Sequence, residues 1–113
     1  MLATISEHRP DIAVLKLTGE LDSDTAAKLH ATLADLLDRT VPRIVVDLSG
    51  LKFCDSVGLS AFITCKQVIS ERGGWLSFAC AGPFLVNLLE TVGLKRYFAI
   101  YPRVEDAIAA AGS

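Results

Sequence analysis

Short apolar runs alternate along the chain with longer stretches in which apolar residues recur every three or four positions. Five runs that are rich in β-branched, leucine or aromatic residues are typical of strands. The predicted strands cover residues 2–7, 12–18, 44–48, 75–80 and 98–101. The run Ile44-Val45-Val46 is apolar throughout, which is typical of a strand that is covered on both faces.

Four stretches with the helical period follow the second strand and each later strand. They extend from residues 22–24 to 38–40, from Gly58 to residues 71–74, from residues 81–83 to Gly93, and over residues 104–110. In the third of these helices, the residues predicted to face the core are Leu85, Leu88, Leu89 and Val92.

The order of these elements predicts how the strands pair. A polar turn that contains Pro10 joins the first two strands, which predicts an antiparallel hairpin. Strands that are separated by helices pair in parallel through right-handed crossovers. The order ββαβαβαβα therefore predicts a layered α/β fold around a mixed, mostly parallel sheet. The pattern by itself leaves open whether the helices cover one face of the sheet or both.

Composition narrows the class of protein. The 113 residues are enough for a single domain, residues 1–113, with one two-layer core. A net charge of -2 disfavours nucleic acid as a direct partner. No apolar run approaches the roughly 18 residues of a membrane span, and the first residues lack the basic start of a signal peptide. We therefore expect a cytoplasmic protein without membrane contact.

No residue pattern indicates a cofactor or a metal. The chain has neither a glycine-rich phosphate loop nor the Cys and His spacing of a metal site. Its three cysteines, Cys54, Cys65 and Cys80, lie within apolar patterns and are expected to be reduced core thiols.

The junction between the third strand and the next helix is the most informative segment. It places Ser56 at a helix entrance, ahead of a polar stripe formed by Ser60, Thr64, Gln67 and Glu71. Asp55 is expected to act as the N-cap of this helix. Gly58 has two interpretations: it gives a partner room for close approach, or it eases the turn into the helix.

Four segments together carry a resemblance to a known family. They are Gly19-Glu20-Leu21-Asp22, Asp55-Ser56-Val57-Gly58-Leu59, Gly73-Gly74 and Thr91-Val92-Gly93-Leu94. In this order, over nearly the whole chain, they resemble the STAS domain, and more narrowly the free-standing bacterial anti-sigma factor antagonists. The resemblance implies about five strands, with an antiparallel N-terminal hairpin, and four helices packed mainly on one side of the sheet.

The resemblance also implies a function. Ser56 would be the phosphoacceptor of an anti-sigma factor with serine kinase activity. Unphosphorylated, the protein would bind this partner and release a sigma factor; phosphorylated, it would let go, and a serine phosphatase of the PP2C type would restore it. The docking surface implied for the partner consists of Asp22, Asp55, Val57, Gly58 and Ser60. Val57 stands where the family often has a second hydroxyl residue, which argues against dual phosphorylation.

Two other functions are alternatives to this switch. An enzyme with Ser56 as nucleophile is disfavoured, because the sequence around it has no glycine before the serine and no histidine partner at a recognised spacing. A STAS subunit of a lipid-transport or stressosome-like assembly is the alternative within the family. Stable copurification with a transporter ATPase instead of a kinase would favour the transport subunit.

Overall fold

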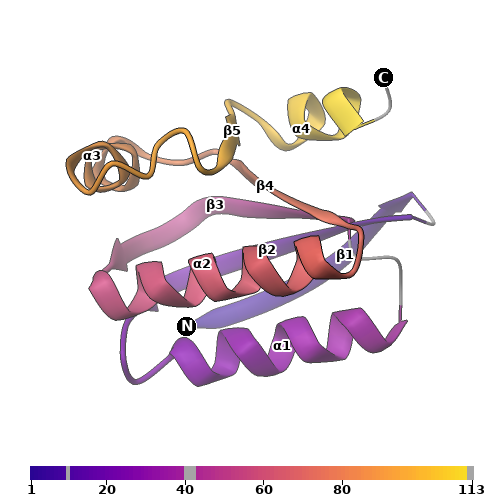
Figure 1. Ribbon diagram of the computed structural model, residues 1–113, viewed down its shortest axis with the longest axis horizontal. Helices are drawn as coiled ribbons and strands as arrows, with labels where there is room; N and C mark the ends of the chain where they lie inside the picture. The colour runs from indigo at the N-terminus through magenta and orange to yellow at the C-terminus, as the bar shows by residue number, and fades with distance from the viewer. Residues whose placement is uncertain (10, 40–42, 112–113) are drawn as a thin grey trace.

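A five-stranded sheet forms the centre of the computed structural model, which describes residues 1–9, 11–39 and 43–111. The strands lie side by side in chain order from β1 to β5 (Figure 1). The first pair is antiparallel and all later pairs are parallel, which confirms the predicted sheet. The strands are β1 (Leu2–Arg9), β2 (Ile12–Leu21), β3 (Arg43–Cys54), β4 (Trp75–Ala79) and β5 (Ala99–Tyr101). Pro10, in the predicted turn, lies outside the described residues.

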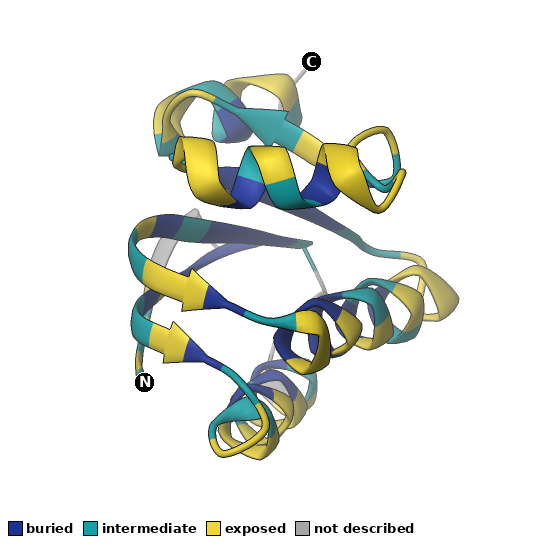
Figure 2. Ribbon diagram, turned by 90° about the vertical axis from the view of Figure 1, so that its left-hand side faces the viewer, coloured by how far each residue is buried: buried dark blue, intermediate teal, exposed yellow. Residues whose placement is uncertain are grey.

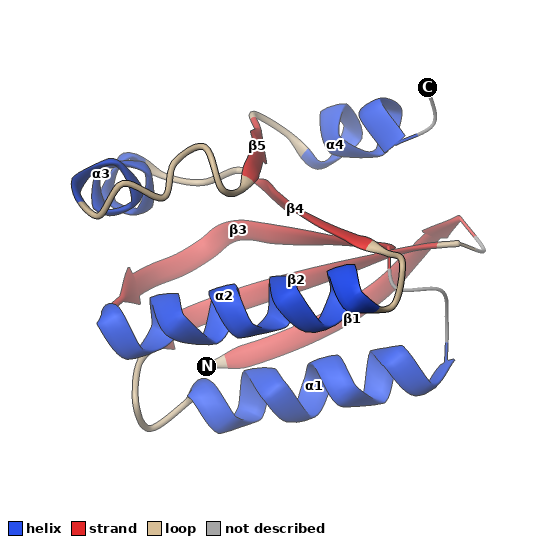
Figure 3. Cartoon of the chain, in the orientation of Figure 1, coloured by secondary structure: helices blue, strands red, loops and turns tan. Residues whose placement is uncertain are grey.

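Four helices follow the strands in the predicted order (Figure 3). They are α1 (Ala26–Arg39), α2 (Ser56–Glu71), α3 (Pro83–Thr91) and α4 (Val104–Ala111). Thr40, the outer limit of the first predicted helix, lies outside the described residues. Each parallel strand is added on the same side of the one before it, so right-handed crossovers place α1, α2 and α3 on one face of the sheet. The strand order thus answers the question that the pattern left open.

The larger of two hydrophobic cores lies between the sheet and these three helices. Phe78 of β4 is its centre: it is fully buried, and its ring lies 5.0 Å from Phe62 of α2 and 4.6 Å from Phe98. Leucines of α1 and α3, such as Leu33 and Leu89, complete it. Burying side chains of this size contributes about 1.5–3 kcal/mol each, so this core supplies most of the stabilisation of the fold.

A smaller core lies on the opposite face, beneath α4. Strand residues whose side chains point away from the large core, including Val14, Val45 and Ala79, pack there with Ala107 of α4. Val45 is fully buried, as are its neighbours in the sequence, so the prediction of a strand covered on both faces is confirmed. The helices thus lie mainly on one side, as the resemblance implied.

β1 runs two residues past its predicted end, to Arg9, and β2 and β3 extend further. β2 continues past Thr18 to Leu21, and β3 continues past Leu48 to Cys54. The two extensions pair with each other, with register shifts that mark β-bulges. Bulges break the alternation of inward and outward side chains, which is why the sequence pattern stopped short. β4 pairs with β3 only from Arg43 to Asp47, so the extension of β3 has one strand neighbour.

The prediction that Val92 lies in the core is wrong. α3 ends at Thr91, and Val92 is its C-cap residue with 47% of its surface exposed. Leu85 and Leu89, from the same predicted stripe, are buried. The helical period continued one residue beyond the helix, because Val92 is apolar but the chain turns there towards Gly93, whose φ is +77°.

Candidate functional site

Ser56 is the first residue of α2 and its side chain is exposed. Asp55 immediately before it is the N-cap, as predicted: its Oδ1 accepts a hydrogen bond of 2.9 Å from the backbone N–H of Gly58. A cap of this kind stabilises a helix by about 1 kcal/mol. The Ser56 hydroxyl makes no hydrogen bond to another described residue. The fold therefore holds the backbone of Ser56 in place and leaves its oxygen accessible.

The polar stripe that Ser56 heads faces outward, as predicted. Ser60, Thr64, Gln67 and Glu71 are all exposed. The opposite side of α2 enters the large core and is formed by Gly58, Leu59, Ala61, Phe62, Cys65 and Ile69. Val57, beside Ser56, is 45% exposed although it is apolar. Ser56, Val57 and Ser60 thus form one accessible surface at the start of the helix.

Gly58 differs from the other predicted docking residues because it is buried. A Cβ atom at this position would lie 2.4 Å from the carbonyl oxygen of Leu21 and 2.9 Å from its Cγ. The glycine therefore allows α2 to pack directly against the end of β2. Packing inside the protein is thus a reason for the missing side chain that the sequence did not indicate, and the two interpretations from the sequence stay predictions.

Leu21 also connects the two loops of the site. Its carbonyl accepts a hydrogen bond of 3.3 Å from the N–H of Asp55, at the point where β2 and β3 end side by side. Figure 2 shows these two strand ends next to each other, each with exposed residues just before a buried tip, before the chain turns into α1 and α2. Asp22 directly follows Leu21, and Ser56 directly follows Asp55, so both lie at the end of the sheet where β2 and β3 finish.

The Asp22 side chain is held within its own loop. Its Oδ1 accepts a hydrogen bond of 3.0 Å from the N–H of Asp24, while its own N–H donates to the hydroxyl of Thr25 at 2.9 Å. That hydroxyl in turn donates to the carbonyl of Glu20 at 2.9 Å. Hydrogen bonds within the loop therefore hold the Asp22 carboxylate in a fixed position directly after the end of β2.

Sequence reasoning missed two aromatic residues at this end of the molecule. Phe53 of β3 and Phe84 of α3 are 42% and 52% exposed, and their rings stack with centroids 6.0 Å apart. Phe53 lies beyond the predicted end of its strand, at residue 48, so the pattern gave no reason to place it on the surface. Nothing local to Phe84 distinguishes it from a core residue, because only the tertiary structure brings the two rings together.

The cysteines are partly as predicted. Cys54 and Cys65 are buried free thiols, whereas Cys80 is only half-buried and has a φ of 60°. Burial, and then the charge of Asp55, raises the pKa of Cys54 to about 12, and burial raises the pKa of Cys65 to about 11. The thiolate is the reactive form, so Cys54 stays an inert thiol at neutral pH despite its position beside Asp55.

Raising the pH from 8 to 11 is expected to destabilise the fold through Cys54 and Cys65. In the unfolded chain both thiols have a pKa near 9.0, but in the fold they keep their protons up to about 12 and about 11. The unfolded state therefore loses protons first, and the free energy of unfolding falls as the pH rises above about 9. Urea unfolding at the two pH values measures this loss. The double variant Cys54→Ala, Cys65→Ala should show a smaller fall in the free energy of unfolding between these pH values. An equal fall in the variant and the original protein would contradict the expectation.

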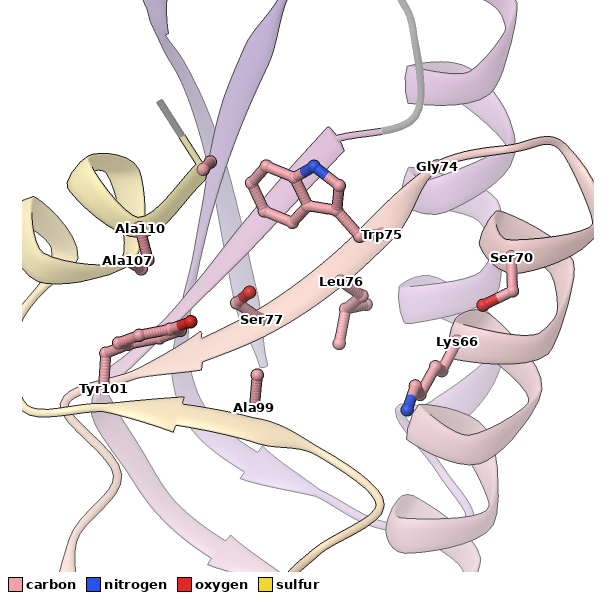
Figure 4. A pocket seen from close by; sticks show the side chains of 11 residues that line it. Lys66, Ser70, Gly74, Trp75, Leu76, Ser77, Ala99, Tyr101, Ala107 and Ala110 are labelled. Atoms are coloured by element: carbon pink, nitrogen blue, oxygen red, sulfur yellow. The ribbon is translucent and has the colours of Figure 1, made fainter. Parts of the chain in front are cut away.

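A pocket of about 350 Å³ lies away from Ser56, at the start of β4 (Figure 4). Its walls include Lys66, Trp75 and Tyr101. The Lys66 ammonium already donates a hydrogen bond to the backbone carbonyl of Tyr97. It also lies 4.0 Å from the centroid of the Tyr97 ring. The pocket thus offers no unengaged charge that would select a ligand.

Within residues 1–9, 11–39 and 43–111, no cluster of three or more His, Cys, Asp or Glu side chains is arranged to hold a metal ion. None of the helices in the same residues has the length and apolar character that crossing a membrane requires.

Comparisons with known proteins agree with this architecture. Residues 3–107 match the model of the STAS domain family. The anti-sigma F factor antagonist of Paenibacillus polymyxa is 28% identical over 103 residues, which cover 90% of this chain and 88% of the relative. The crystal structure of an anti-sigma factor antagonist from Mycobacterium paratuberculosis has a TM-score of 0.87 at 26% identity, over 99% of this chain and 94% of that chain. The antagonist SpoIIAA in its unphosphorylated form shares the fold, with a TM-score of 0.82 at 19% identity over 97% and 96% of the two chains.

Proposed function

The chain belongs to the STAS domain family, and we propose that residues 1–113 form one such domain that acts as an anti-sigma factor antagonist. Unphosphorylated, it binds an anti-sigma factor with serine kinase activity in the cytoplasm, and a sigma factor is released. Phosphorylation of Ser56 by this partner ends the binding, and a serine phosphatase of the PP2C type restores it. The likeness to named antagonists over most of both chains supports this function.

The accessible hydroxyl of Ser56 is the observation that carries the proposal. A kinase must reach the acceptor oxygen, and Ser56 is exposed at the very start of α2, with no hydrogen bond to a described residue that would have to break. The Asp55 cap and the packing of Gly58 on Leu21 hold the backbone on either side. The acceptor is thus accessible on a rigid support.

A phosphate at this position changes the surface of the protein without unfolding it. The group adds about -1.5 to -2 charges at neutral pH. Free backbone N–H groups and the dipole at the start of α2 stabilise that charge, so the helix tolerates it. In the complex the new phosphate faces the carboxylate of Asp55 and the phosphates that remain on the nucleotide of the kinase. Repulsion and bulk then separate the two proteins.

The proposed docking surface surrounds Ser56. Asp22, Asp55, Val57 and Ser60 lie at the edge where β2 and β3 end and α2 begins. Gly58 contributes from beneath, because it sets how closely α2 approaches β2. The site needs neither cofactor nor metal, and it is a binding surface with a modification site and not a catalytic centre. Neither nucleic acid nor a membrane takes part in the switch.

Phosphate transfer tests the proposal directly. The protein is incubated with ATP and each serine-kinase anti-sigma factor of its organism, and intact and peptide masses are measured. One phosphate on Ser56 is expected. Ser56→Ala should carry none, whereas Ser70→Ala, which removes an exposed hydroxyl at the far end of α2, should be modified like the original protein.

Two outcomes would count against the switch. Phosphate on Ser70 or another residue, retained in Ser56→Ala, would reject Ser56 as the acceptor. No phosphate with any of the kinases would reject the antagonist function and favour a constitutive STAS subunit of a transport or stressosome-like assembly.

A further inference from the structure

An exposed aromatic pair lies at the same end of the sheet as Ser56. Among the described residues, the large apolar side chains that are exposed are Leu2, Phe53, Val57, Phe84 and Val92. Phe53 and Phe84 are the aromatic ones, and they stack on each other with an interplanar angle of 30°. Exposed apolar groups that are gathered in this way mark interaction sites more often than scattered ones do.

The fold explains why these rings stay uncovered. Phe53 lies in the part of β3 beyond its pairing with β4, and it pairs with Glu20 of β2 next to a register shift. Cys54, the next residue, is buried in the large core, whereas Phe53 and Phe84 lie at the surface around a small hollow that Leu48, Leu51, Gly82 and Leu85 also line. Neither β4 nor another strand pairs with this part of β3 on the side away from β2 within the described residues. The rings are therefore left uncovered beside the unpaired part of β3, at the start of α3.

This aromatic pair is continuous with the phosphoacceptor. Phe53 is three residues before Ser56, and an extended segment of that length spans at most about 10–11 Å. Val57, the third apolar residue of this region, directly follows Ser56 and is 45% exposed. A partner that covers Ser56 closely enough to transfer a phosphate therefore reaches these rings as well.

Carboxylates border the same region. Glu20, Asp22, Asp24 and Asp55 lie at the end of β2, in the loop after it and at the end of β3. Within the described part of the chain these four form no ion pair. Basic groups lie nearby: Lys52 precedes Phe53, and the Met1 nitrogen and Lys28 lie near Gly19 at the end of β2. The four carboxylates outnumber these basic groups, and this excess of negative charge favours a positively charged surface opposite it.

We propose that Phe53 and Phe84 form the apolar anchor of the docking surface, and that the anti-sigma factor presents an apolar pocket bordered by lysine or arginine side chains. The basic side chains face Glu20, Asp22 and Asp24, while the bound nucleotide of the partner faces Ser56. This inference rests on the proposed function, because it assigns to the kinase partner the surface beside the acceptor serine. Buried aromatic anchors commonly dominate such interfaces.

Binding of the anti-sigma factor, measured by calorimetry with ADP so that no phosphate is transferred, tests the anchor. Phe53→Ala and Phe84→Ala are each expected to raise the Kd at least 10-fold. Val92→Ala removes an apolar side chain of similar exposure from the opposite end of α3 and should change the Kd less than 2-fold. Melting temperatures of the variants, measured beside the Kd values, show whether each one is folded.

Charge reversal tests the chemistry of the partner. Glu20→Lys is expected to raise the Kd at least 10-fold at low salt, whereas Glu71→Lys, the same change at the far end of α2, should leave it within 2-fold. Unchanged or tighter binding of Glu20→Lys would overturn the basic partner surface, and this variant does not depend on the aromatic residues for folding.

The outcomes separate the inference from the function on which it rests. If the original protein binds the kinase and the folded Phe53→Ala and Phe84→Ala variants bind equally well, the anchor is wrong and the antagonist function stands. If sedimentation shows a dimer that Phe84→Ala dissociates, the surface belongs to a second copy of the chain and the inference is overturned. If the original protein binds none of the kinases, the proposed function falls, and the inference falls with it.

Discussion

Gly58→Ala is expected to lower the free energy of unfolding by about 2–4 kcal/mol. Alanine would normally stabilise a helix by about 1 kcal/mol relative to glycine. Here, however, its Cβ would lie 2.4 Å from the Leu21 carbonyl oxygen, 2.9 Å from Leu21 Cγ and 3.0 Å from the Leu21 carbonyl carbon. Two of these atoms belong to the backbone and cannot turn away, so α2 must move from β2. The clash therefore outweighs the gain in helix propensity.

Urea unfolding measures this change, and Gly82→Ala is the matched control. Gly82 caps α3 with a φ of -75°, and a Cβ there would meet no atom within 4 Å. Its replacement should change the free energy of unfolding by less than about 1 kcal/mol. Equal stability of Gly58→Ala and the original protein would show that the contact with Leu21 is looser than the structure has it.

The same substitution should also disturb the acceptor site. The N–H of Gly58 donates to the Asp55 cap, and Ser56 lies between these two residues. A shift of α2 therefore displaces Ser56 relative to Asp22. Transfer of phosphate to Gly58→Ala, measured below its melting temperature, is expected to be slower than transfer to Gly82→Ala.

Phosphorylation of Ser56 is expected to weaken binding of the anti-sigma factor at least 100-fold, which corresponds to about 2.7 kcal/mol. Like charges opposed across an interface cost several kcal/mol, and the phosphate would lie beside Asp55 and opposite the nucleotide of the kinase. The melting temperature should change by less than about 3 °C, because the start of α2 accommodates the charge. Calorimetry of the purified phosphorylated protein, with binding and thermal unfolding measured on the same sample, tests both statements.

Substitutions separate the effect of position from the effect of charge. Ser56→Asp carries a smaller charge and should weaken binding by a part of the phosphate effect. Ser70→Asp places the same carboxylate on an exposed position of α2 close to Glu71, where the helix ends, and should leave binding within 2-fold. The switch would be contradicted if the phosphorylated protein bound the anti-sigma factor with the same Kd as the unmodified protein. It would also be contradicted if the phosphorylated protein lost binding because it had unfolded.

The sequence located most of the site because its parts are local. Ser56 and Asp55 belong to one turn, and an N-cap is read from residue type and spacing alone. The stripe from Ser60 to Glu71 is exposed because the helical period separates it from the buried side of the same helix. Each of these features lies within one helix and its first turn, so the pattern of polar and apolar residues was sufficient to predict it.

The features that sequence reasoning missed depend on contacts between distant segments. Gly58 is needed because of Leu21, and Phe53 stacks on Phe84, which is 31 positions later in the chain. The extension of β3 was missed for the same reason: its pairing with β2 contains bulges, so its side chains do not alternate. No local pattern records a neighbour of this kind.

Periodicity and capping are properties of short segments, so the sequence predicted the element order, the mixed sheet, and the exposed Ser56 with its Asp55 cap. Contacts across the fold place the three connecting helices on one face, bring Asp22 and Ser56 to the same end of the sheet, and put two aromatic rings and four carboxylates beside them. These depend on how strands register and how α2 packs on β2. Such packing is set by the whole chain at once, since each contact joins residues that are far apart in the sequence.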